Sequence, residues 1–189
     1  MRSPRLLDRR RTALVLIDVQ ERYRTVLHGW GRVSAACDLL LQGAQALGIP
    51  TLVTEQYPRG LGHTAEELAR RFGPGVRVVE KQSLSCCGAS EFVEALAALG
   101  TKQVLIAGIE THACVNQTVH DLLEAGYQVH LAADATSSRL PGDVAPAWAK
   151  MLAAGMLPTT SEQALLELVE TAAAPEFRGL QALMKEAKR

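Results

Sequence analysis

The chain has 189 residues, of which 48% are hydrophobic and 21% are charged, as in ordinary globular proteins. We therefore expect one compact domain over residues 1–189. Its 20 basic and 20 acidic side chains give a net charge of zero, which argues against a basic surface that binds nucleic acid. No apolar run reaches membrane-spanning length. We expect the basic residues before Thr12 to be a solvated lead-in to the first strand rather than a targeting signal, because Asp18 interrupts the apolar run that follows them.

Strand-like and helix-like segments alternate along the chain. The first segment, Thr12–Asp18, is an apolar run ending in a carboxylate, as expected of a strand covered on both faces. The spacing of apolar residues, Gly and Pro predicts the other elements, with residues 56–63 as a loop. Further strands are predicted at 51–55, 76–80, 103–107, 127–133 and 157–159, and helices at 33–47, 64–72, 90–99, 113–125, 141–154, 160–173 and 175–187.

This alternation predicts an α/β fold, a Rossmann-like three-layer α/β/α sandwich around a mostly parallel six-stranded sheet. Two of the helices begin with capping-box patterns, in which a Ser or Thr hydroxyl caps the helix and a residue three positions later bonds back. These patterns are Thr64-x-x-Glu67 and Thr160-x-x-Gln163.

Three reactive side chains follow the ends of predicted strands: Asp18, Lys81 and Cys114. The carboxyl ends of parallel strands meet at one edge of a sheet, so we expect the three side chains to converge there. Taken one at a time, each has an ordinary explanation: a capping carboxylate, a solvated lysine and a buried thiol. Together they predict a catalytic site.

The segment from Val104 to Val115 carries the most chemistry. An apolar strand ends in Gly108, a turn follows, and Cys114 falls in the first turn of the next helix. The helix dipole and a nearby ammonium are expected to lower the pKa of this thiol and favour the thiolate. Backbone N–H groups near Glu110 and Cys114 are placed to form an oxyanion hole. The segment therefore predicts a cysteine hydrolase.

Three ordered segments, with a fourth after the next strand, carry a family resemblance from about residue 10 to residue 172. The chain resembles the isochorismatase-like cysteine hydrolases, a superfamily that includes nicotinamidases and carbamoyl-amide hydrolases. The resemblance implies the isochorismatase-like hydrolase fold. The matching segments are Leu14–Gln20, Glu80–Lys81, Gly108–Thr118 and Ala132–Ala135.

The same resemblance implies a role for each matching residue. Asp18 resembles the family's general base, Lys81 its catalytic lysine and Cys114 its nucleophile. It also implies a cis peptide bond between Ile109 and Glu110, which would aim the Glu110 N–H, with that of Cys114, at a substrate carbonyl oxygen.

One segment departs from the nicotinamidases, which carry an Asp-x-His…His metal site after the second strand. Here that region offers only Glu55 and His63, fewer than the three protein ligands of a catalytic metal. We therefore expect no metal and no other cofactor, and a main substrate other than nicotinamide. Thr54–Pro58 and Ser85–Gly88 instead resemble the subgroup of isochorismatase-domain-containing proteins.

Polar residues near the strand ends are candidates for the substrate pocket. For Cys86 and its neighbour we favour pocket packing over a redox role. The cysteine spacings fit no zinc site and predict free thiols in a reducing cytoplasm. The predicted substrate-binding residues are Gln20, Tyr23, Gln56, Tyr57 and Cys87.

The leading hypothesis is hydrolysis of a small amide C–N bond through a Cys114 thioester. An isochorismatase-type vinyl-ether hydrolase is an alternative that needs no thiol, and a non-catalytic binding protein on the same fold is another. The expected partner is a small-molecule substrate, with no nucleic acid and no membrane, in a homo-oligomer that is a dimer or larger.

Overall fold

The computed structural model describes residues 2–187. Within that range six strands form one sheet in the order β3-β2-β1-β4-β5-β6, and every neighbouring pair is parallel. This confirms the predicted α/β fold. The strands are β1 (Thr12–Ile17), β2 (Thr51–Gln56), β3 (Val76–Lys81), β4 (Gln103–Ile109), β5 (Gln128–Ser137) and β6 (Leu157–Thr159).

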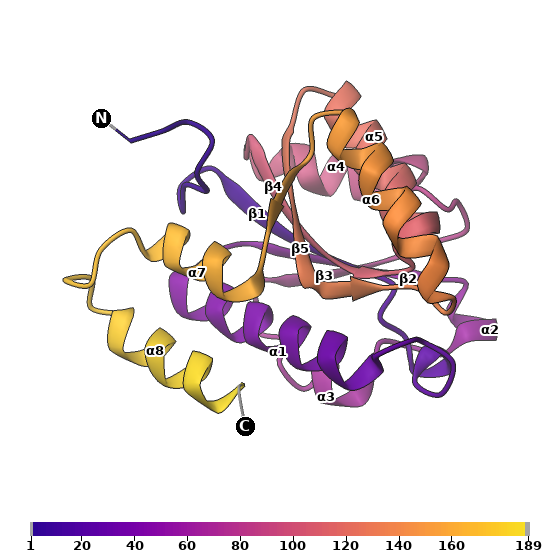
Figure 1. Ribbon diagram of the computed structural model, residues 1–189, viewed down its shortest axis with the longest axis horizontal. Coiled ribbons are helices and arrows are strands. Elements are labelled where there is room, and N and C mark those ends of the chain that lie inside the picture. Colours follow the sequence, from indigo (N-terminus) through magenta and orange to yellow (C-terminus); the bar gives the residue numbers. More distant parts are fainter. Residues whose placement is uncertain (1, 188–189) are drawn as a thin grey trace.

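Helices cover both faces of the sheet and make the outer layers of a sandwich (Figure 1). One face carries α1 (Trp30–Leu47), α3 (Glu66–Ala69), α7 (Ser161–Val169) and α8 (Phe177–Glu186). The opposite face carries α4 (Ser90–Ala98), α5 (Asn116–Glu124) and α6 (Val144–Ala153). None of the described helices is long and apolar enough to cross a membrane.

Strand β1 shows why the sheet is a continuous apolar layer. All six of its residues are buried, and its side chains alternate between two apolar cores because strand side chains point to opposite faces. Leu14 and Leu16 pack into the core under α1, whereas Val15 and Ile17 pack into the core under α4 and α5. Asp18 comes directly after this run, so its carboxylate starts at the edge of the buried layer.

The strand order reverses direction between β1 and β4, and open α/β sheets bind ligands outside the carboxyl ends at such a point. The two strands approach closely there because Gly108 pairs with Ile17. Gly108 has φ +126°, and a Cβ on it would lie 2.1 Å from the carbonyl oxygen of Ile17. Only glycine fits this position.

Two local predictions were wrong at the start of α3. Residues 56–63 contain a short helix, α2 (Pro58–Leu61), and Thr64 does not cap the helix that follows. The Thr64 hydroxyl instead donates to Glu55, because this buried carboxylate needs partners.

The second predicted capping box, at Thr160-x-x-Gln163, is formed only in part. The Thr160 hydroxyl accepts the Gln163 N–H at the start of α7, as predicted. The Gln163 side chain bonds Glu167 further along the helix rather than bonding back to Thr160.

Candidate functional site

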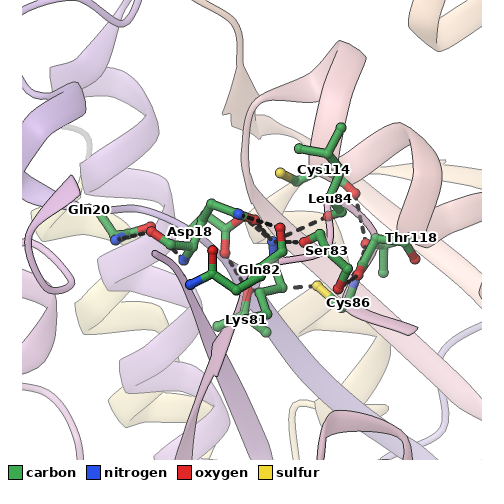
Figure 2. A network of polar contacts seen from close by, with 12 residues as sticks. Asp18, Gln20, Lys81, Gln82, Ser83, Leu84, Cys86, Cys114 and Thr118 are labelled. Atoms are coloured by element: carbon green, nitrogen blue, oxygen red, sulfur yellow. Dashed lines mark hydrogen bonds and ion pairs between the residues drawn. The ribbon is translucent and has the colours of Figure 1, made fainter. Parts of the chain in front are cut away.

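Asp18 and Lys81 form a buried ion pair at the carboxyl edge of the sheet (Figure 2). The Lys81 Nζ lies 2.7 Å from Asp18 Oδ2, and the Thr54 hydroxyl donates to Asp18 Oδ1 at 2.7 Å. Asp18 has left-handed backbone geometry, with φ 53°, as the chain turns out of β1. Both charges are therefore paired, as burial requires.

The Lys81 ammonium has four oxygen acceptors. Besides Asp18, these are Gln56 Oε1 at 2.7 Å and the carbonyl oxygens of Ser83 and Leu84, each at 3.2 Å. Burial is the largest single influence and lowers the pKa of Lys81, but the charge and hydrogen bond of Asp18, together with Cys86 and Cys114, outweigh it, so the pKa is raised. An ammonium has three N–H donors, and these four oxygens are enough to accept from all of them.

Cys114 lies beside this pair, in a π-helical turn, η3 (Thr111–Val115), that joins β4 to α5. The pKa of its thiol is raised to about 12, first by burial and then by the charge of the Asp18 carboxylate and a hydrogen bond to it, while Lys81 opposes the shift. The sequence-based expectation of a lowered pKa was therefore wrong. It considered the helix dipole and the ammonium but neither burial nor the facing carboxylate. At rest the residue is a thiol next to a carboxylate.

The backbone before Cys114 is tightly constrained. The Ile109–Glu110 peptide bond is cis, as the resemblance implied. The Glu110 carboxylate accepts bonds from the backbone N–H of Arg139, at 2.9 Å, and from its Nε, at 3.0 Å. On the following turn the Thr118 hydroxyl donates to the Cys114 carbonyl at 2.7 Å. These contacts fix the turn that carries the thiol.

The structure brings Cys86, and not Cys87, next to the charged pair. Cys86 is fully buried, its Sγ lies 3.7 Å from Thr54 Oγ1, and its N–H donates to Thr118 at 2.9 Å. Cys87 is only partly buried, and the charged group that acts on it is Asp121. Pocket packing was expected for Cys86, but only Cys87 was predicted to bind substrate, because the sequence of a short turn does not show which of its residues faces inward. No role was predicted for Thr54 on β2 or Thr118 on α5.

The other predicted pocket residues differ in their surroundings. Tyr23 is half-buried near Cys114; burial and the charges of Glu110 and Cys114 raise its pKa to about 12. Tyr57 is 48% exposed on the loop after β2. Gln20 is fully buried, and its amide bonds the backbone of Gln56 and Gly62. Of the predicted pocket residues, Gln56 contacts Lys81 directly and Tyr23 lies near Cys114, whereas Gln20 supports a loop.

The region around Glu55 and His63, where we expected no metal site, contains a cluster of hydrogen bonds. Glu55 accepts bonds from Thr64 N and Oγ1, at 2.7 and 2.8 Å, and contacts His63 Nδ1 at 2.8 Å. Across residues 2–187, no three His, Cys, Asp or Glu side chains are grouped to hold a metal ion. The four cysteines are all free.

Comparison with known proteins places this geometry in a family. The isochorismatase domain model matches residues 12–163. Isochorismatase domain-containing protein 1 of Salmo salar is 41% identical over 175 residues, covering 92% of this chain and 61% of the relative. Isochorismatase domain-containing protein 2 of Danio rerio is 38% identical over 180 residues, covering 94% of this chain and 89% of the relative.

A solved structure shows the same fold. A MAR1 ribonuclease from Caenorhabditis elegans is 36% identical, with a TM-score of 0.91, covering 95% of this chain and 92% of that one. The chain spans about three fifths of the length of the protein-1 relatives from Salmo salar and Danio rerio. With its parallel sheet and a domain match over most of its length, the chain belongs to the isochorismatase-like hydrolase family.

Proposed function

We propose that the chain hydrolyses the C–N bond of a small amide through a thioester on Cys114. The observation that carries this proposal is the buried thiol beside the Asp18 carboxylate, which is itself held by Lys81. A thiol is a weak nucleophile until a base removes its proton, and Asp18 is positioned to be that base.

In the acylation step, the Cys114 proton moves to Asp18 as Sγ forms a bond to the substrate carbonyl carbon. The carbonyl oxygen becomes an oxyanion, which we assign to the backbone N–H groups of Glu110 and Cys114. Asp18 then gives the proton to the leaving nitrogen as the C–N bond breaks. Ammonia or an amine leaves, and Cys114 carries a thioester.

In the deacylation step, Asp18 takes a proton from water as the water oxygen attacks the thioester carbonyl. The C–S bond breaks, the acid is released, and the proton returns from Asp18 to the Cys114 sulfur. Lys81 stays an ammonium throughout, because its pKa is raised and its donors are occupied. It stabilises negative charge as the proton moves between the other two residues.

Two observations favour a small substrate over a nucleic acid, although the Caenorhabditis elegans relative is named a ribonuclease. The net charge of zero offers no general attraction to phosphates, and both members of the Asp18–Lys81 pair are buried.

We further propose that the chain works in the cytoplasm as a homo-oligomer, a dimer or larger. Light scattering that shows only single chains would contradict the assembly.

The test is release of ammonia or amine from a panel of small amides by wild type, Cys114→Ala and Cys37→Ala. Cys37 is a buried thiol in the core under α1, so its variant controls for loss of a buried sulfur. We expect turnover by wild type and Cys37→Ala, and none by Cys114→Ala. Turnover of isochorismate but of no amide would favour vinyl-ether hydrolysis, nucleotide release from RNA would favour a ribonuclease, and inactivity on all three would favour a binding protein.

A further inference from the structure

Gln56 contacts the catalytic lysine directly, and its contact with Lys81 is as short as that of Asp18. Its Oε1 lies 2.7 Å from the Lys81 Nζ, equal to the distance from Nζ to the Asp18 carboxylate. Of the four acceptors around the ammonium, Asp18 alone is charged, and the two backbone carbonyls are more distant at 3.2 Å. The Gln56 amide is therefore the main neutral partner of the cation.

The orientation of the Gln56 amide is determined by its partners. Lys81 can only donate, so it faces Oε1, and the Gln82 carbonyl can only accept, so it faces Nε2 at 2.7 Å. A flipped amide would lose both hydrogen bonds. The side chain thus bridges Lys81 and the backbone that follows it.

Gln20 holds the backbone of Gln56 in turn. Its Oε1 accepts the Gln56 N–H at 2.8 Å, and its Nε2 donates to the Gln56 carbonyl at 3.0 Å and to the Gly62 carbonyl at 2.5 Å. Gln20 is fully buried, so these bonds are shielded from water. Two glutamines first considered for substrate binding therefore form a chain of contacts that ends on Lys81.

We propose that Gln56, fixed by Gln20, is a positioning residue that holds Lys81 without neutralising it. This inference rests on the proposed function, in which Lys81 must face the negative charge left when the Cys114 proton moves to Asp18. A carboxylate at position 56 would share the cation and place a second negative charge near the thiol. A neutral amide supplies the same hydrogen bond and leaves the positive charge available.

The first test measures Lys81 itself. Its ammonium signal is followed by NMR in protein with isotope-labelled lysines and assigned by its loss in Lys81→Met. Lys102, Lys150 and Lys185 are exposed, so their ammonium protons exchange rapidly with water. In Gln56→Leu we expect the Lys81 protons to exchange about tenfold faster, because one strong charge-assisted bond is lost.

The second test measures the thiol through the rate of iodoacetamide addition to Cys114, located by peptide mass spectrometry, between about pH 8 and 10. In Gln56→Glu we expect addition to be about tenfold slower across this range, since the added charge raises the pKa of Cys114. The matched control is Gln82→Glu, which adds the same charge on an exposed neighbour whose backbone alone contacts Gln56. It should stay within about twofold of wild type.

An unchanged Lys81 signal in Gln56→Leu, together with an unchanged thiol profile in Gln56→Glu, would overturn the positioning role. Equal slowing of iodoacetamide addition in Gln82→Glu would also overturn it, because any added negative charge near the site would then explain the effect. If Gln56→Glu does not fold, Gln56→Asn replaces it: the amide is one methylene too short to reach Lys81, so faster Lys81 exchange is expected. If Lys81 responds as expected but no amide is hydrolysed, only the proposed function fails.

Discussion

Strand β2 ends in two polar clusters that lie on opposite faces of the sheet. Thr54 and Gln56 point to one side and contact Asp18 and Lys81, whereas Glu55, between them, points to the other and contacts Thr64 and His63. Both clusters contain a buried carboxylate with short hydrogen bonds, so burial and pairing alone do not mark a reactive site.

The two carboxylates differ in the chemistry of their partners. The Asp18 carboxylate faces a lysine that stays charged and a thiol whose proton it can accept. Glu55 is bonded by a backbone N–H, a hydroxyl and an exposed imidazole, and its pKa is lowered even though burial opposes this. We interpret the first cluster as reactive and the second as a structural tie between β2 and the segment before α3. Four substitutions test this contrast.

Asp18→Asn should have the largest effect, and it should act in opposite directions on two rates. Turnover of the amide found active in the panel should fall by about 100-fold or more, because the asparagine cannot accept the thiol proton. Addition of iodoacetamide to Cys114 should become faster, because the carboxylate that raises the thiol pKa is gone. Slower addition of iodoacetamide would contradict a thiol pKa raised by the carboxylate, and unchanged turnover would argue against Asp18 as the base.

Lys81→Met should lower stability more than the same substitution at a surface lysine. Removing one member of a buried pair leaves Asp18 without its cation, at a cost of about 3–5 kcal/mol in the free energy of unfolding. Urea unfolding measures this loss, with Lys102→Met, at an exposed lysine, as the control. A loss of less than about 1 kcal/mol, as for a surface pair, would mean that water solvates the Asp18–Lys81 pair.

These two residues also show what the sequence could predict. Asp18 directly follows the last apolar residue of β1, and Lys81 is the last residue of β3. Because the strands are parallel, the topology alone brings both residues to one edge of the sheet. The pKa of Cys114 could not be predicted, since it depends on the segments that cover the thiol and on Asp18, which is distant in sequence. The same limit applies to Gln56: its position near the end of the second strand was evident, but its bond to Lys81 depends on a side-chain direction.

Glu55→Gln tests the second cluster and should lower stability by about 1–2 kcal/mol, with turnover within about twofold of wild type. The glutamine oxygen can still accept from Thr64, but the charge is lost. Because the pKa of Glu55 is lowered by folding, its contribution is present above the unfolded value and disappears as pH falls through the folded value. Urea unfolding should therefore show the difference from wild type shrinking in acid. A large loss of turnover would mean that this cluster also supports the reaction.

His63→Ala should have the smallest effect, and its pH dependence should run the other way. The bond to Glu55 raises the pKa of His63, so its contribution is present below the ordinary histidine value and disappears as pH rises through the folded one. The difference in Tm between wild type and His63→Ala should therefore be larger near about pH 6 than near about pH 9. His28→Ala, at an exposed histidine outside this cluster, is the control. A Tm difference that did not change with pH would show that the contact between His63 and Glu55 does not depend on the charge of the imidazole.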